Sequence, residues 1–171
     1  MQGFVQIYTG DGKGKTTAAL GLALRAFGAG LKVYVAHFMK QGDYGEVAAL
    51  ARLGDQVTAE QFGTGRFVRG MPDAQDLAAA RNALAAVRSA MASGQFDLVI
   101  ADEANVAVAS GALDEQDLLD LIAARPGPVE LVLTGRGATS AVMAAADLVT
   151  EMKAVKHYFK RGVTARKGIE Y

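Results

Sequence analysis

Short apolar runs recur along the chain and alternate with longer segments in which apolar residues are spaced three and four apart. The runs are almost continuously apolar, as expected of strands buried on both faces of a parallel sheet. The spaced segments are typical of amphipathic helices, because residues three and four apart lie on one face of a helix. The runs predict six strands, at residues 4–8, 31–38, 56–62, 96–101, 129–133 and 147–152.

The helix boundaries follow from capping and chain-breaking residues. The longest predicted helix opens at Asp73 and ends at Gly94, and its apolar stripe consists of Leu77, Ala80, Leu84, Val87 and Met91. A later helix begins near Asp114, with Asp117 three residues on as a weaker relative of the capping box, and stops before Pro126. One of the other two predicted helices follows the first strand and its glycine-rich loop and is closed off by Gly28 and Gly30. The other covers residues 46–53.

Strands that alternate with helices in this way predict an α/β fold, with a mostly parallel sheet, helices on both faces, and a single domain over residues 1–171. In such sheets ligands bind outside the carboxyl ends of the strands. The chemically distinctive residues all follow predicted strands, so we expect them at one rim. The first of these groups is a glycine-rich loop after the first strand. The others, at the ends of later strands, are Lys40, Arg66 with Phe67, Asp102 with Glu103, and Arg136.

The segment between the first strand and the first helix reads Thr9-Gly10-Asp11-Gly12-Lys13-Gly14-Lys15-Thr16, followed by Thr17. Glycines there allow backbone N–H groups to turn inward on a phosphate chain, Lys15 can reach the outer phosphates, and the Thr16 hydroxyl can bind Mg²⁺. The following helix adds the positive end of its dipole. The pattern G-x-x-x-x-G-K-[ST] is met except at Thr9, where it asks for glycine. A phosphate-binding loop is predicted, with mere strand-to-helix connectivity as the alternative.

Two polar groups at other strand ends complete the predicted site. Asp102 and Glu103 stand where phosphate-loop proteins place the acid that holds Mg²⁺, directly or through water. An acid pair at a strand end can instead be a helix N-cap, but the glycine loop upstream favours the metal role. Arg136 lies in a Thr-Gly-Arg turn, where its planar guanidinium suits phosphate oxygens, although it can also be an ordinary surface arginine. His37, inside an apolar strand, is predicted to be a core histidine with a satisfied hydrogen bond.

Composition narrows the chemistry further. The formal net charge is zero, which argues against general affinity for nucleic acid or for acidic membranes. No apolar run approaches the ~20 residues that span a bilayer. The chain has no cysteine, which removes disulfides and thiolate chemistry and fits a reducing cytoplasm, so a cytoplasmic protein is predicted. With no serine, cysteine or histidine constellation for nucleophilic catalysis, we expect the protein to position its reactants.

Two further segments have open interpretations. The loop after the third strand carries Arg66, Phe67, Val68 and Arg69 among glycines, which suits a lid over a flat apolar ligand, or else is an ordinary mobile connection. The tail from Lys153 to Lys167 carries six cations and no acid, and is either functional or a solvated surface.

Several sequence blocks of the chain together resemble those of one known protein family. They are Thr9–Ala18, Phe38-Met39-Lys40, Asp102-Glu103 with Asn105, Arg125-Pro126-Gly127, Leu133-Thr134-Gly135-Arg136, Ala146–Met152, Val155-Lys156-His157, Gly162-Val163 and Gly168-Ile169-Glu170-Tyr171. On these blocks the chain resembles the P-loop type of ATP:corrinoid adenosyltransferase, also called cob(I)yrinic acid a,c-diamide adenosyltransferase. The resemblance covers essentially the whole chain, and its most specific part is the tail, since very many proteins share a phosphate loop.

The resemblance implies a RecA-like, P-loop NTPase-like fold, a homodimer, MgATP, a corrinoid reduced to Co(I), and a reductase or flavodoxin-type electron donor. The Co(I) attacks C5′ of ATP and triphosphate is released, with ATP lying in the loop so that C5′ faces the corrinoid. By analogy Lys13, Lys15, Thr16 and Thr17 hold the triphosphate, Thr16 and Glu103 bind Mg²⁺ with Asp102 beside them, and the loop from Arg66 to Arg69 flanks the corrin. The residues implied to serve the reaction itself are Lys15, Thr16, Glu103 and Phe67.

One block departs from the family. Members have a Gly-Phe-Thr-Trp run in the corrinoid loop, whose aromatic residues help to exclude the lower axial ligand of cobalt, and this chain has Gly65-Arg66-Phe67-Val68 in its place. Phe67 is expected to take over that role. Two other functions remain open from the residues alone: an ordinary P-loop ATPase or kinase, and a nucleotide-gated carrier that delivers finished adenosylcobalamin.

Overall fold

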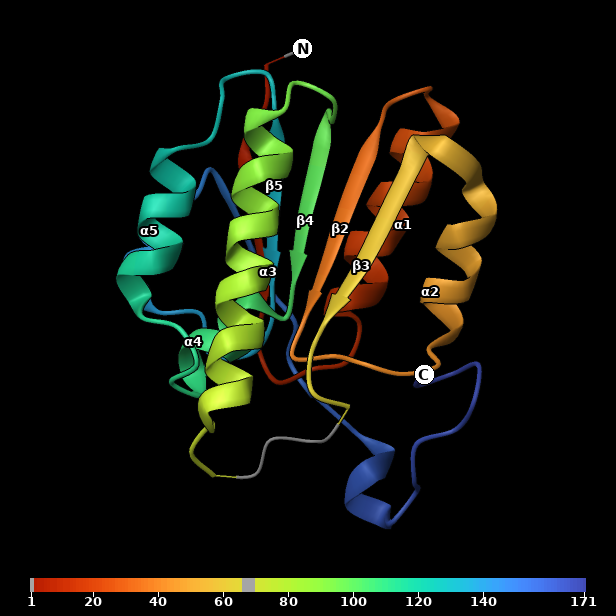
Figure 1. Ribbon diagram of the computed structural model, residues 1–171. Coiled ribbons are helices and arrows are strands. Elements are labelled where there is room, and N and C mark those ends of the chain that lie inside the picture. Colours follow the sequence, from red (N-terminus) through yellow and green to blue (C-terminus); the bar gives the residue numbers. More distant parts are fainter. Residues whose placement is uncertain (1, 66–69) are drawn as a thin grey trace.

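The computed structural model describes residues 2–65 and 70–171, and the strands in these residues form one parallel sheet (Figure 1). The strand order is β3-β2-β4-β5-β1-β6, and all pairings are parallel. This confirms the predicted α/β fold, and every predicted strand is found within two residues at each end. The strands are β1 (Val5–Thr9), β2 (Val33–Phe38), β3 (Val57–Phe62), β4 (Leu98–Asp102), β5 (Glu130–Thr134) and β6 (Leu148–Glu151).

Helices connect the strands on both faces of the sheet. They are α1 (Lys15–Gly28), α2 (Gly45–Leu50), α3 (Ala74–Ala92), α4 (Ala104–Ala109), α5 (Glu115–Ala123) and α6 (Ser140–Ala144), with 3₁₀ helices η1 (Ala51–Gln56) and η2 (Tyr158–Arg161). The four predicted helices correspond to α1, α2 with η1, α3 and α5. The sequence did not predict α4, α6 or η2, because elements of four to six residues are too short to show a repeating spacing. In the described ranges no helix combines the length and apolar character that crossing a bilayer requires.

The two faces of the sheet are packed by different helices, as Figure 1 shows, with α1 and α2 on one side and α3, α4 and α5 on the other. On the first face Ala19, Ala23 and Ala26 of α1 pack with strand residues such as Val35 and Ile100. Small alanines let the helix approach the sheet closely, which sets the position of its first turn above the rim. The second face is a larger core that includes α3 and α5.

The predicted starts of α3 and α5 are confirmed, and α3 also has a capping box that the sequence did not predict. Asp73 accepts hydrogen bonds from the backbone nitrogens of Gln75 (2.9 Å) and Asp76 (3.1 Å), and Asp76 accepts one from Asp73 N (3.2 Å). Asp114 and Asp117 form a second capping box. The predicted apolar stripe of α3 is wrong at one residue. Leu77 is 36% exposed, because the first turns of α3 extend past the carboxyl ends of the strands (Figure 1).

The chain after β6 returns across the carboxyl rim and passes over the glycine loop. Met152 N donates to Thr9 O (2.8 Å), and Gly12 N donates to Met152 O (2.6 Å). The tail then runs below the strand ends and finishes beside Gly45, where α2 begins (Figure 1). The tail therefore borders the loop from β1 on one side and α2 on the other.

Gly63, directly after β3, packs closely against the backbone that follows β2, and this contact can be tested. A Cβ at this position would lie 2.6 to 2.8 Å from backbone atoms of Lys40, so Gly63→Ala forces the backbone after β2 to move. We expect the free energy of unfolding in urea to fall by about 2 kcal/mol. Gly21→Ala is the matched control, because this exposed position in α1 has no atom within 4 Å of its Cβ. The control should gain roughly 0.5–1 kcal/mol, and equal stability of the two variants would contradict the close approach.

Candidate active site

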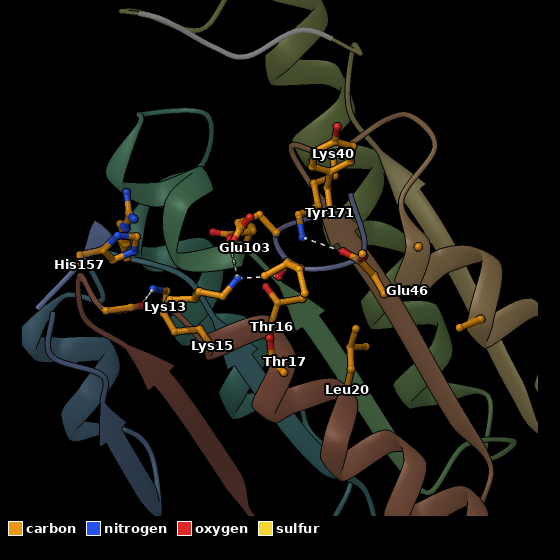
Figure 2. A pocket seen from close by; sticks show the side chains of 18 residues that line it. Lys13, Lys15, Thr16, Thr17, Leu20, Lys40, Glu46, Glu103, His157 and Tyr171 are labelled. Atoms are coloured by element: carbon orange, nitrogen blue, oxygen red, sulfur yellow. Dashed lines mark hydrogen bonds and ion pairs between the residues drawn. The ribbon is translucent and has the colours of Figure 1, made fainter. Parts of the chain in front are cut away.

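A cavity of about 760 Å³ opens at the carboxyl rim, above the loop between β1 and α1 (Figure 2). Groups that follow four strands meet there: the glycine loop, Lys40, Glu103 and Arg136. The predicted clustering at one rim is therefore confirmed for these groups. The cavity is lined by Gly12, Lys13, Gly14, Lys15, Thr16, Thr17, Leu20, Lys40, Gly45, Glu46, Ala49, Glu103, Arg136, His157, Gly168, Ile169, Glu170 and Tyr171.

Lys15 is the first residue of α1 and is 7% exposed. Its Nζ donates to the carbonyl oxygens of Gly10 (2.8 Å) and Gly12 (2.7 Å), so the side chain folds over its own loop. Burial, and then the charge of Arg136, lowers the pKa of Lys15. A negatively charged ligand between Lys15 and Arg136 would offset the repulsion of the two cations. The position between Lys15 and Arg136 therefore favours an anionic group.

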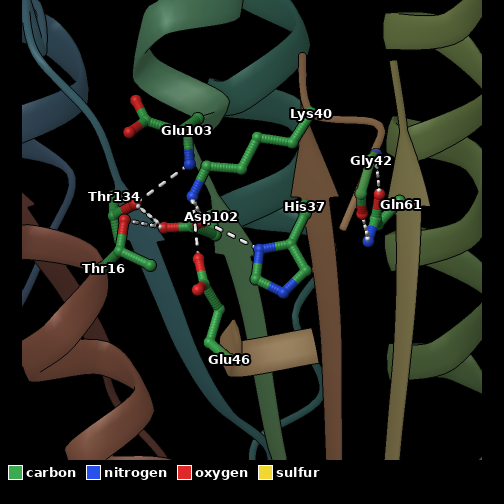
Figure 3. A network of polar contacts seen from close by, with 9 residues as sticks. All are labelled: Thr16, His37, Lys40, Gly42, Glu46, Gln61, Asp102, Glu103 and Thr134. Atoms are coloured by element: carbon green, nitrogen blue, oxygen red, sulfur yellow. Dashed lines mark hydrogen bonds and ion pairs between the residues drawn. The ribbon is translucent and has the colours of Figure 1, made fainter. Parts of the chain in front are cut away.

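Asp102 ends β4 and is fully buried behind the cavity (Figure 3). Its Oδ1 accepts hydrogen bonds from the hydroxyls of Thr16 (2.8 Å) and Thr134 (2.7 Å). Its Oδ2 contacts His37 Nδ1 (2.9 Å) and accepts from Lys40 Nζ (3.1 Å). Burial alone would raise the pKa of Asp102, but the hydrogen bond from His37 and the charge of Lys40 outweigh it, and the pKa lies well below its usual range. The carboxylate is therefore ionised, and it fixes the position of Thr16.

The histidine prediction is confirmed for one ring nitrogen only. His37 is fully buried, and its Nδ1 donates to the ionised Asp102 because a carboxylate can only accept. In the described part of the chain Nε2 has no hydrogen-bond partner. His37 is thus a part of the polar network around Asp102 rather than an ordinary core residue.

Glu103 points its carboxylate into the cavity (Figure 2). Burial, and then the charge of Asp102, raises the pKa of Glu103. Its backbone nitrogen donates to Thr134 Oγ1 (2.9 Å), and its φ of 63° turns the chain from β4 into α4. Glu103 occupies the N-cap position of α4, but its side chain caps no backbone N–H there. The helix-cap interpretation of the acid pair is therefore not supported by a capping hydrogen bond.

These oxygens fit a magnesium ion. Mg²⁺ prefers oxygen ligands, usually one or two carboxylates with substrate phosphates and water. The Thr16 hydroxyl and the Glu103 carboxylate line the cavity, while Asp102 lies directly behind Thr16. Burial and the charge of Asp102 raise the pKa of Glu103 more than Lys40, Lys15 and Arg136 lower it, and a bound cation would stabilise its ionised form further. No group of three or more His, Cys, Asp or Glu side chains suited to a metal occurs within residues 2–65 and 70–171.

The remaining predicted residues occupy different positions. The Thr9 hydroxyl accepts from Ala138 N (3.3 Å), so it braces the turn that carries Arg136 rather than lining the cavity. Asp11 lines a second, neighbouring cavity, which Arg136 also borders. Lys13 and Thr17 line the first cavity. The predicted corrinoid residues Arg66, Phe67, Val68 and Arg69 lie outside the described residues.

Sequence reasoning missed two contributions to the site. Thr134 stood in a block of interest, but only the neighbouring Arg136 was assigned a role. Its polar side chain at the end of an apolar strand was the available signal. The wall formed by Gly168–Tyr171 was also missed, and no local pattern in the sequence places it against the loop from β1.

The Asp102 network makes acid stability a test of its charge. A carboxyl whose folded pKa is depressed stabilises the protein fully above its unfolded pKa of about 3.9 and loses that contribution as the pH falls toward the folded value. Asp102→Asn should therefore be less stable than the original protein at pH 7, and the difference should shrink by about 1 kcal/mol by pH 3. Urea denaturation at both pH values measures this. A difference that does not change with pH would contradict an ionised Asp102.

Comparison with known proteins gives the same result along the whole chain. The family model of ATP:corrinoid adenosyltransferase BtuR/CobO/CobP matches residues 1–171. The chain is 38% identical over 171 residues to a corrinoid adenosyltransferase of Pseudomonas aeruginosa, in an alignment that covers 99% of this chain and 84% of that protein. It is 36% identical over 172 residues to the corrinoid adenosyltransferase of Escherichia coli strain K12 and to that of Salmonella typhimurium, covering 99% of this chain and 86% of each relative. The chain belongs to the ATP:corrinoid adenosyltransferase family.

Proposed function

We propose that this protein transfers the 5′-deoxyadenosyl group of MgATP to the Co(I) of a reduced corrinoid, either cobalamin or cob(I)yrinic acid a,c-diamide, and releases triphosphate. The observation that carries the proposal is the cavity over the glycine loop, bordered by Lys13, Lys15 and Arg136, in a chain that belongs to this family throughout. Lys13, Lys15 and Arg136 border the cavity together with the first turn of α1.

The chemistry suits a protein that supplies no nucleophile. The electron pair of Co(I) attacks C5′, a cobalt–carbon bond forms, and the bond from C5′ to the α-phosphate oxygen breaks. The electron pair of the broken C–O bond leaves with the triphosphate, so negative charge grows on the phosphate chain. Fixed cations next to the chain stabilise this charge. Lys15 and Arg136 are proposed to act on it directly, and the protein otherwise brings the two substrates together.

The proposed nucleotide contacts come from the loop and the start of α1. Lys13, Lys15, Thr16 and Thr17 line the cavity and are proposed to hold the triphosphate with the backbone of Gly14. Thr9, Gly10 and Asp11 are proposed to shape the loop rather than to contact the phosphates, since the cavity lining does not include them.

Magnesium is proposed to bind the Thr16 hydroxyl and the Glu103 carboxylate, with Asp102 as the ionised partner of Thr16. The ion, when bound, neutralises part of the phosphate charge and orients the chain. The Thr16 hydroxyl donates a hydrogen bond to Asp102, so the lone pairs of the Thr16 oxygen remain available for a cation.

The corrinoid is proposed to lie against Arg66, Phe67, Val68 and Arg69. Support comes from Gly63, three residues before Arg66, because Gly63 packs against the backbone of Lys40, which lines the cavity. A homodimer, a reductase or flavodoxin-type electron donor and a cytoplasmic location complete the proposal, and these rest on the family resemblance.

An anaerobic assay tests the reaction. Protein, MgATP and chemically reduced cobalamin should yield a light-sensitive alkylcobalamin spectrum and free triphosphate. Lys15→Ala should weaken MgATP binding by about a hundredfold or more, as measured by calorimetry, because the buried cation next to the phosphates is lost. Lys32→Ala is the matched control, since Lys32 is exposed at the amino end of β2 and should leave binding unchanged.

The same assay separates the other two functions. Release of ADP and phosphate without corrinoid would identify an ATPase or kinase instead. Retention of finished adenosylcobalamin, released by ATP without any turnover, would identify a carrier. Either result would overturn the transferase proposal.

The metal role of Glu103 has its own test. Glu103→Gln should raise the Mg²⁺ concentration for half-maximal activity by about tenfold, because a carboxylate ligand becomes a neutral amide. Glu46→Gln makes the same change elsewhere on the cavity wall, where Glu46 lies 3.7 Å from Lys40 Nζ, and should alter the Mg²⁺ requirement little. Equal shifts in both variants would reject Glu103 as the ligand.

A further inference from the structure

The last described residues of the tail, 166–171, fold into a tight turn that forms one wall of the cavity (Figure 2). Within this C-terminal turn, Glu170 N donates to Arg166 O (2.9 Å) and Gly168 N donates to Tyr171 O (2.7 Å). Gly168, Ile169, Glu170 and Tyr171 all line the cavity. The proposed function assigns no task to this turn, although it contains one of the most specific blocks of the sequence.

Glu170 is the centre of the C-terminal turn. Its Oε2 accepts from Arg166 N (2.7 Å) and Arg166 Nε (3.2 Å), and its Oε1 accepts from Arg166 Nη2 (3.2 Å) and the hydroxyl of Tyr158. All of these donors belong to the tail itself. The carboxylate is therefore held in place whether or not any residue of the glycine loop contacts it.

Lys13 of the glycine loop reaches this wall. Its Nζ donates to Ile169 O (2.6 Å) and to Glu170 Oε1 (3.3 Å), across 156 and 157 residues of sequence. The Lys13 side chain is 41% exposed and the Glu170 side chain only 17%, so the fixed partner is Glu170. A lysine on an exposed loop loses rotamer freedom when a ligand orders it, and a contact made in advance removes part of that cost.

The count of donors and charges leaves Lys13 able to bind an anion. An ammonium group has three N–H donors, and two of them contact the C-terminal turn, so one remains for a ligand. The charge of Glu170 is shared with Arg166, which lies in a two-point contact with the carboxylate. Lys13, Arg166 and Glu170 together carry one net positive charge beside the cavity.

We propose that Glu170 is a positioning residue for triphosphate binding, which holds the Lys13 ammonium against the wall of the cavity with one N–H free for a phosphate oxygen. The inference rests on the proposed role of the loop as the triphosphate site. It gives the C-terminal turn a function in nucleotide affinity, exerted through Lys13 and without contact between Glu170 and the phosphates.

The opposite relation would be an inhibitory clasp, in which Glu170 and Ile169 O take the place of phosphate oxygens and must release Lys13 before the nucleotide binds. The two relations predict opposite signs. Removal of the Glu170 charge weakens nucleotide binding if Glu170 positions Lys13, and strengthens it if Glu170 competes with the phosphates.

The test measures binding of MgATP and of inorganic triphosphate to the full chain by calorimetry, without corrinoid. Glu170→Gln should raise both dissociation constants by about five- to tenfold, the range expected for loss of one charge-assisted contact. In turnover assays KM for MgATP should rise by a similar factor with little change in kcat. Tyr158→Phe removes a single support of Glu170 and should give a smaller change in the same direction.

Two controls separate positioning from loss of structure. Glu115→Gln makes the same change of charge at an exposed site on α5 and should leave both dissociation constants unchanged. Lys13→Met should weaken binding, and Glu170→Gln should add nothing further in the Lys13→Met background, because Glu170 acts only through Lys13.

Three results would overturn the proposal. Tighter binding by Glu170→Gln would establish the inhibitory clasp, and unchanged binding would show that the contact has no role. Additive losses in the double variant would show that Glu170 supports the tail in general. Because binding is measured without corrinoid, these results stand whether or not the adenosyl transfer itself is observed.

Discussion

The buried charge of Asp102 is the constraint on which the rim of the sheet depends. An ionised carboxylate in a protein interior is strongly destabilising unless hydrogen bonds and opposite charges compensate it. The compensation comes from α1 through Thr16, from β5 through Thr134, and from His37 and Lys40 at the end of β2. Since β5 lies between β1 and β4, Thr134 connects the loop of one strand to the acid of the other. The charge therefore sets the relative positions of the groups that face the cavity.

Local patterns in the sequence predicted most of the fold and the centre of the site. The glycine loop, the starts of α3 and α5 and the strands depend on residues close in sequence, so local patterns reveal them. The roles of Thr134 and His37 depend on the strand order, which places β4 between β2 and β5 and is not encoded in any one segment. The contact of Lys13 with Glu170 spans 157 residues and requires the path of the tail as well. Leu77 was misplaced for a related reason, since helical periodicity does not tell where the sheet ends.

A neutral chain can still place several cations around one cavity. The zero net charge bears only on general affinity for polyanions, which depends on the whole surface. At the cavity, Lys13, Lys15 and Arg136 meet, while Lys40 is neutralised by Asp102 and Glu46. The proposed attraction for a triphosphate is thus local to this cavity.

The contact of Gly12 N with Met152 O has a consequence for the meaning of the loop's glycines. A Cβ on Gly10 or Gly12 would lie 2.5 or 2.7 Å from the carbonyl oxygen of Met152. These two positions therefore exclude side chains because another part of the same chain crosses them, before any phosphate is present. The N–H of Gly12 is already engaged and is not a free donor for a ligand. The loop is therefore packed against the segment that follows β6, so a substitution in that segment can distort the loop proposed to hold the nucleotide without changing a residue of the glycine pattern.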